Sequence, residues 1–212
     1  MKTQELIGLL AQDPMPAAPA PREQLAKPLL GATLACGLLV LAFWGLHPQL
    51  RQLLLHPAFI TKMLWLASVI GFSCYGLLRL SRPGVSVGHA VWGLVLSMLA
   101  MTSLGLIQSM QAEPGSRLAL WMGSSWLACA VSILVLSLPV LGALLWALRQ
   151  LAPTQPRLAG AVAGAMAGGV AASLYSLHCT ETTFAFFAAW YGGGLLLTSG
   201  LGALLGARLL RW

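Results

Sequence analysis

The most concentrated group of chemically reactive side chains lies in a short polar stretch between two long apolar segments. His178, Cys179 and Glu181 bring an imidazole, a thiol and a carboxylate within four residues. Such groups can bind a transition metal, and the thiol favours soft ions such as Cu(I), Zn or Cd. A metal site normally needs three or four converging ligands, so no cofactor is assigned with certainty. The alternative is that Glu181 and the neighbouring threonines cap the following helix.

A second cysteine, Cys129, is a candidate partner for Cys179. We expect it about nine residues inside a membrane span that begins near residue 120, which is roughly 13 Å from the outer end of that span. Cys179 is expected at the same outer side. In an oxidising compartment the two thiols could cycle between thiol and disulfide if their Cα atoms came within about 7 Å. Cys129, His178 and Cys179 are therefore tentative metal ligands, with Glu181 beside them. The alternative is that a buried cysteine acts only as a small apolar side chain.

The composition places these residues in a membrane protein. Only 8% of the 212 residues are charged and 58% are apolar, which lies outside the range of soluble domains. In lipid, every backbone amide must be satisfied inside the protein, so long apolar runs become helices. We expect an all-α polytopic protein, a bundle of six segments that each approach the ~20 residues needed to cross a bilayer. The segments are about 28–46, 61–80, 89–107, 120–147, 158–177 and 184–206.

The distribution of Lys and Arg predicts the orientation. With the N-terminus in the cytoplasm, nine basic residues lie on the cytoplasmic side, and only Arg51, Lys62 and Arg117 lie on the other. This positive-inside bias predicts a bacterial inner-membrane protein with both termini in the cytoplasm. The basic residues are scattered singly, so membrane lipid is the expected surroundings and direct nucleic-acid binding is not expected.

The fifth segment carries Gly160, Gly164 and Gly168 at four-residue spacing. One face of this helix is almost bare backbone, which predicts close packing against the sixth segment. A glycine-lined path through a small transporter or metal carrier is the alternative. The inner parts of the spans contain no Asp, Glu, Lys or Arg, whereas ion-coupled transporters usually place an ionisable group there. An enzyme is not expected, because no general base can be paired with a nucleophile.

The N-terminal tail, residues 1–27, is expected to lie in the cytoplasm ahead of a transmembrane domain over 28–212. Residues 3–12 predict a short amphipathic helix, and a Pro- and Ala-rich spacer follows it. A helix this short is marginal alone in water, so we expect it to order against a partner, either the membrane surface or a groove on a cytoplasmic protein. Its apolar face consists of Leu6, Ile7, Leu9 and Leu10.

The whole chain resembles the NrsF family. The resemblance is carried by the ordered combination of Met1–Ile7, Ser125–Cys129 leading to Ser137-Leu138-Pro139, Ala152-Pro153, Tyr175–Glu181, Trp190-Tyr191 and Arg208–Trp212. It implies a six-span inner-membrane anti-sigma factor that holds an extracytoplasmic-function sigma factor and releases it under metal or oxidative stress. It also implies that the tail helix binds the sigma factor and that Cys129 and Cys179 carry the response. We therefore assign signal sensing to Cys129, His178, Cys179 and Glu181. Thr180 departs from the family pattern, in which Pro often follows the second cysteine.

Overall fold

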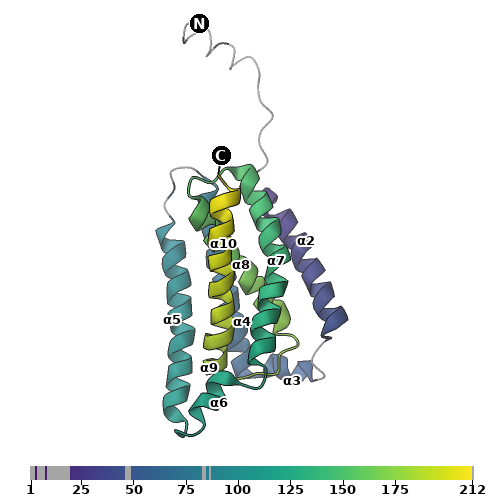
Figure 1. Ribbon diagram of the computed structural model, residues 1–212, viewed down its shortest axis with the longest axis vertical. Coiled ribbons are helices and arrows are strands. Elements are labelled where there is room, and N and C mark those ends of the chain that lie inside the picture. The colour runs from purple at the N-terminus through teal and green to yellow at the C-terminus, as the bar shows by residue number, and fades with distance from the viewer. Residues whose placement is uncertain are drawn as a thin grey trace.

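Six long helices run side by side in the computed structural model, which describes Thr3, Gly8 and residues 20–45, 49–82, 85 and 87–211 (Figure 1). The predicted all-α fold is confirmed, because six helices of the described residues are long and apolar enough to cross a membrane. The elements are α2 (Pro21–Phe43), α3 (Leu50–Leu55), α4 (Pro57–Leu80), α5 (Gly88–Gln111), α6 (Arg117–Met122), α7 (Trp126–Leu151), α8 (Pro156–Tyr175), α9 (Phe184–Phe186), the π-helical turn η1 (Phe187–Tyr191) and α10 (Gly192–Leu209).

The first and fourth spans differ in detail from the predicted segments. α2 begins at Pro21 and contains Pro28, whose ring removes only one backbone hydrogen bond, so the chain is already helical before residue 28. The fourth segment, predicted as one helix over 120–147, consists of α6 and α7 with a break between them. The break follows Gly123, whose φ of 59° lies in the left-handed region that a β-carbon disfavours.

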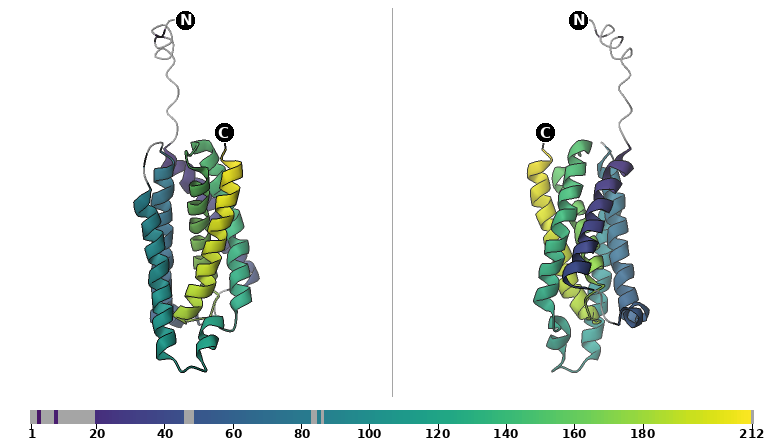
Figure 2. Two further views of the ribbon diagram at one scale, coloured as in Figure 1. Left: turned by 60° about the vertical axis from the view of Figure 1, so that its left-hand side comes forward. Right: turned by 90° about the vertical axis from the view of Figure 1, so that its right-hand side faces the viewer.

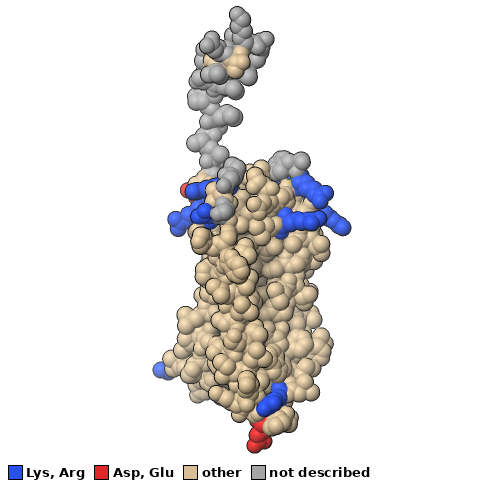
Figure 3. Space-filling view, turned by 90° about the vertical axis from the view of Figure 1, so that its left-hand side faces the viewer, with Lys and Arg blue, Asp and Glu red and all other residues tan. Residues whose placement is uncertain are grey.

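The two ends of the bundle carry different chemistry. α2 begins and α10 ends at one end, while α3, α6 and α9 lie at the other (Figures 1 and 2). We call the first the arginine end; its described basic residues are Arg22, Lys27, Arg79, Arg82, Arg149, Arg157, Arg208 and Arg211. We call the second the cysteine end, after Cys129 and Cys179. On the face drawn in Figure 3, most basic side chains gather at the arginine end, and an uncharged band separates them from the few charges at the other end.

α8 forms the centre of the bundle and packs against α10, α7, α4 and α2. A β-carbon on Gly160 would overlap the carbonyl oxygen of Gly202, and one on Gly164 would overlap that of Thr198. A β-carbon on Gly168 would overlap the Thr198 hydroxyl. The three glycines therefore line a backbone-to-backbone contact with α10 and not an open path.

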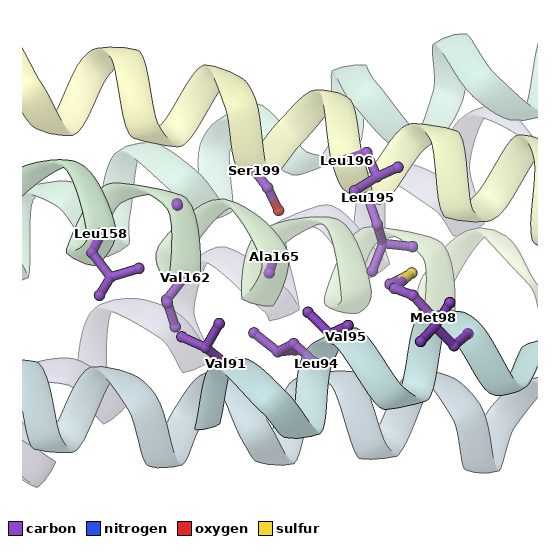
Figure 4. Close-up of a pocket in the computed structure, with 12 residues that line it drawn as sticks. Val91, Leu94, Val95, Met98, Leu158, Val162, Ala165, Leu195, Leu196 and Ser199 are labelled. Atoms are coloured by element: carbon purple, nitrogen blue, oxygen red, sulfur yellow. The ribbon is translucent and has the colours of Figure 1, made fainter. Parts of the chain in front are cut away.

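An apolar groove of about 300 Å³ lies between α5 on one side and α8 and α10 on the other (Figure 4). Met98, Val162 and Leu195 are among its lining residues, and Ser199 is the one polar side chain in the lining. The groove therefore offers hydrocarbon contacts and no charged group for a polar solute.

Candidate thiol site

Cys129 and Cys179 meet at the cysteine end, with 3.5 Å between their sulfur atoms. Both side chains are buried, at 0% and 3% exposure. The predicted segment 120–147 is interrupted between α6 and α7, so Cys129 lies in the first turn of α7 and not nine residues along one continuous helix. Its depth in a membrane stays a prediction. Because α7 begins at Trp126, the Cys129 thiol lies beside the turn that carries Cys179.

Local backbone structure fixes both thiols. The Cys129 amide donates to the carbonyl of Ser125 at 2.9 Å, and the Cys179 amide donates to the carbonyl of Tyr175 at 3.1 Å as the chain leaves α8. The Ser125 hydroxyl lies 3.5 Å from the Cys129 sulfur, within hydrogen-bonding reach. Each cysteine is therefore held within one turn of a helix end, where small shifts of that end move its sulfur.

Glu181 ties the Cys179 turn to the start of α7. Its Oε1 accepts hydrogen bonds from the Ser124 backbone N–H at 2.8 Å and the Ser124 hydroxyl at 2.7 Å. The alternative that Glu181 caps the following helix is wrong, because these donors belong to the break between α6 and α7. A negative charge at this place also suits the positive end of the α7 dipole.

Gln108, from the end of α5, caps α9 in place of the predicted acidic residue. Its side-chain oxygen accepts from the backbone N–H groups of Phe184 at 2.7 Å and Ala185 at 3.2 Å. The Thr183 hydroxyl donates instead to the Leu120 carbonyl at 3.3 Å. Residues from α5, α6 and α7 therefore hold the turn after α8 in place.

Lys62 is a functional candidate that the sequence did not reveal. It is 0% exposed, and its ammonium nitrogen has no hydrogen-bond partner. The nitrogen lies 5.1 Å from the ring centre of Phe59, 4.6 Å from that of Phe187 and 5.1 Å from that of Tyr191. In the sequence it is the second residue of the predicted span 61–80, so it counted as a charge at the outer end of that span. The helix in fact starts earlier, at Pro57, and this places Lys62 about one turn further inside it.

The surroundings of Cys179 favour its thiolate. The hydrogen bond from Cys129 is the largest effect that lowers the pKa of the Cys179 thiol below its ordinary value, against the opposing effect of burial. Tyr191, the charge of Lys62 and the backbone N–H of Glu181 act in the same direction. Of the two thiols, Cys179 is therefore the one whose surroundings favour the thiolate, the reactive form of cysteine.

His178 lies beside Tyr175, with their ring centres 5.9 Å apart. Its Nδ1 is buried and has no hydrogen-bond partner. Within the residues that the structure describes, no three His, Cys, Asp or Glu side chains gather to hold a metal ion. The geometry thus joins the two thiols, and a metal bound there would have to be held by the thiols without a third ligand of these types.

The other two cysteines do not form a second pair. Cys36 is buried in α2, where its sulfur lies 3.3 Å from the Leu136 carbonyl oxygen, whereas Cys74 is exposed on α4. The tail residues Leu6, Ile7, Leu9 and Leu10, expected to bind a partner, lie outside the described residues.

Comparison with known proteins identifies relatives over the full length. A family model described as "NrsF: Negative regulator of sigma F" matches residues 10–212. A protein of Azospira oryzae named probable anti-sigma-F factor NrsF is 38% identical over 213 residues, which cover 100% of both chains. The anti-sigma-F factor NrsF of Caulobacter vibrioides is 40% identical over 221 residues, again covering 100% of both. No solved structure matches the chain.

Proposed function

The chain belongs to the NrsF family of negative regulators of sigma F, and from this membership we infer that it is a membrane anti-sigma factor whose outer thiols control its hold on a sigma factor. Negative regulation of a sigma factor is common to the family description and to both relatives. Our further proposal concerns the partner, the orientation and the signal. The partner is an extracytoplasmic-function sigma factor, bound by the tail helix over 3–12 with Leu6, Ile7, Leu9 and Leu10.

We propose that the arginine end faces the cytoplasm of a bacterial inner membrane. Eight described Lys and Arg residues lie at that end and three at the cysteine end. This imbalance supports the orientation through the positive-inside rule. The thiols would then face the oxidising periplasm, and the tail would face the compartment that contains sigma factors. A phosphatase that folds only in the periplasm should be active when fused after Cys179; activity only in a fusion after Arg82 would contradict this orientation.

The signal is oxidation of the Cys129–Cys179 pair, and the observation that carries this proposal is their sulfur separation of 3.5 Å. Hydrogen peroxide is a suitable oxidant. The Cys179 thiolate attacks one peroxide oxygen and becomes a sulfenic acid, and the displaced hydroxide takes up a proton to form water. The Cys129 thiol then attacks the sulfenic sulfur, forming the disulfide and releasing a second water. A disulfide bond is about 2.05 Å long, so the sulfurs must approach by roughly 1.5 Å.

A disulfide can act at the far end of the bundle because the helices involved span its length. It would pull the start of α7 toward the turn after α8. α2, which follows the tail, packs against α7 and α8, so a shift of α7 reaches the base of the tail. The bundle would thus have two packings, one for the reduced and one for the oxidised pair. Oxidation favours the second over the first, and a signal must make such a difference in order to shift an equilibrium.

The test is a C129S/C179S double variant, assayed with a reporter gene that depends on the sigma factor. We expect normal amounts in the membrane, full repression and no induction by peroxide. Cys74→Ser is the matched control, because Cys74 is exposed and distant from the pair; this variant should respond normally. Normal induction in the double variant would contradict the assignment of the sensor.

A further inference from the structure

Lys62 lies where a lysine is difficult to accommodate. It is the sixth residue of α4, about 8 Å along the helix from Pro57. A lysine near the end of a membrane helix normally extends its side chain to the interface and keeps its ammonium in water. The Lys62 side chain is instead completely buried, so it is not an ordinary flanking charge.

Three aromatic rings surround the ammonium but do not neutralise it. Phe59 comes from the same helix, while Phe187 and Tyr191 come from η1, and their ring centres lie within 5.1 Å of the nitrogen. Such contacts offset part of the cost of burying a cation. The nitrogen has no hydrogen-bond acceptor, so its charged form would be stabilised by a nearby negative charge.

The thiol pair is the source of that charge. The Lys62 ammonium interacts electrostatically with Cys179, Cys129 and Glu181, in decreasing order. The Glu181 carboxylate is the weakest of the three and is held at Ser124, whose backbone N–H and hydroxyl both donate to Oε1. The thiolate of Cys179 therefore remains as the principal counter-ion.

We propose that Lys62 is the positioning residue of the sensor, acting as the counter-cation that keeps Cys179 ready to attack an oxidant. This inference rests on the proposed function and names a residue that acts through Cys179. It also gives disulfide formation an electrostatic consequence. A disulfide carries no charge, so oxidation leaves a buried ammonium with only aromatic rings around it. The packing of the reduced protein is then disfavoured. Because the start of α4 and η1 carry Lys62 and the rings around it, these are the elements that must move.

Groups other than Lys62 also face Cys179 and affect its pKa. Burial opposes the thiolate, and the hydrogen bond from Cys129 is the largest effect that favours it. A neutral residue at position 62 should therefore shift the titration of Cys179 without abolishing it. The titratable and charged groups that face this thiol are Cys129 from α7, Tyr175 from α8, Tyr191 from η1, Lys62 from α4 and Glu181 from the turn.

The experiment measures the rate at which hydrogen peroxide forms the Cys129–Cys179 disulfide in the full-length protein between pH 5 and 9, with mass spectrometry to locate the bond. The wild-type rate should rise with pH to a midpoint below the ordinary pKa of a thiol, because the surroundings of Cys179 lower its pKa. In Lys62→Gln and Lys62→Met the midpoint should move to higher pH, and the rate at pH 6 should fall at least roughly tenfold, as expected when a nearby opposite charge is lost. Two neutral side chains of different polarity are used so that a folding defect in one does not prevent the test.

Two further variants separate the effect of the Lys62 charge from the effect of its packing. Lys62→Arg keeps the charge and should restore most of the wild-type rate and midpoint. Arg51→Met removes an exposed cation at the same end and should change neither. An unchanged midpoint in the neutral variants would overturn the proposal, and so would a Lys62→Arg variant as slow as Lys62→Gln.

Failure of this inference and failure of the proposed function give different results. If Lys62→Gln oxidises like the wild type while the double cysteine variant loses its response, the role of Lys62 is wrong and the sensor assignment stands. If Lys62→Gln shifts the midpoint while the double cysteine variant still responds, Lys62 controls Cys179 as proposed, but the thiols do not carry the signal.

Discussion

The Glu181 carboxylate accepts a hydrogen bond from the Ser124 backbone N–H at 2.8 Å, although 57 residues separate the two. This bond joins the turn that carries Cys179 to the start of the helix that carries Cys129. The acidic residue of the polar turn therefore holds together the two segments that carry the thiol pair. Removing it should affect the chemistry of both cysteines while leaving them in the chain.

Glu181→Ala should slow disulfide formation. The variant leaves the Ser124 N–H and hydroxyl without their acceptor, and a hydrogen bond to a charged group contributes about 1.5–3 kcal/mol. Because Glu181 is partly exposed, water replaces part of this loss, and we expect a decrease in rate of roughly tenfold. The rate of peroxide-driven disulfide formation is the measurement. Glu113→Ala is the control, since Glu113 is an exposed carboxylate at the same end; an equal effect in both variants would exclude the specific role.

Gly164→Ala should destabilise the bundle. The added methyl group would overlap the Thr198 carbonyl of α10, which cannot move away without separating the two helices. Overpacking of this kind costs about 1–3 kcal/mol. The thermal unfolding midpoint in detergent should fall. Gly200→Ala is the matched control, because nothing lies within 4 Å of its added carbon; it should be neutral or stabilising. Equal midpoints for the two variants would contradict the observed contact.

Cys129→Ala should move the reactivity of Cys179 to higher pH. The hydrogen bond from Cys129 is the largest effect that lowers the pKa of Cys179, and its loss raises that pKa toward the ordinary value of 9.0. The thiolate predominates only above the pKa, so peroxide should oxidise Cys179 more slowly at pH 7 in this variant. Sulfenic acid trapped with dimedone at Cys179 provides the measurement. An unchanged pH profile would show that Cys129 does not stabilise the thiolate. Cys74→Ala serves as the control.

Deletion of residues 1–13 should release the sigma factor without affecting the membrane domain. The predicted tail helix carries the apolar face that we expect the sigma factor to cover, whereas the six spans lie further along the chain. Reporter expression should become constitutive, and the amount of protein in the membrane should stay the same. Replacing Leu6, Ile7, Leu9 and Leu10 by Ser should reproduce the effect. Continued repression by the shortened protein would place sigma-factor binding elsewhere.

Length and hydrophobicity predicted the six helices because those properties alone decide whether a segment can cross a membrane. Helix ends were less predictable. Pro28 suggested a start for the first span, but the helix begins at Pro21. The separation of α6 from α7 depends on the positive φ of Gly123, where a β-carbon would also overlap the Phe186 ring. One glycine among the 23 in the chain carries no signal of its own.

The candidate site was predictable in part. The polar turn and Cys129 could be found as reactive residues, and family resemblance linked the two cysteines. Lys62 could not be found in this way, because its burial depends on Phe187 and Tyr191, which lie more than a hundred residues away in sequence. Proline is favoured in the first turn of a helix, so Pro57 was the available signal that Lys62 lies inside α4.

The most direct test of the account is the affinity of the purified, full-length protein for its sigma factor in the reduced and the disulfide-bonded state. Reduced protein should bind tightly. Protein oxidised by peroxide, with the Cys129–Cys179 bond located by mass spectrometry, should bind at least roughly tenfold more weakly and regain its affinity on reduction. Equal affinities in the two states would contradict the claim that this thiol pair controls release of the sigma factor.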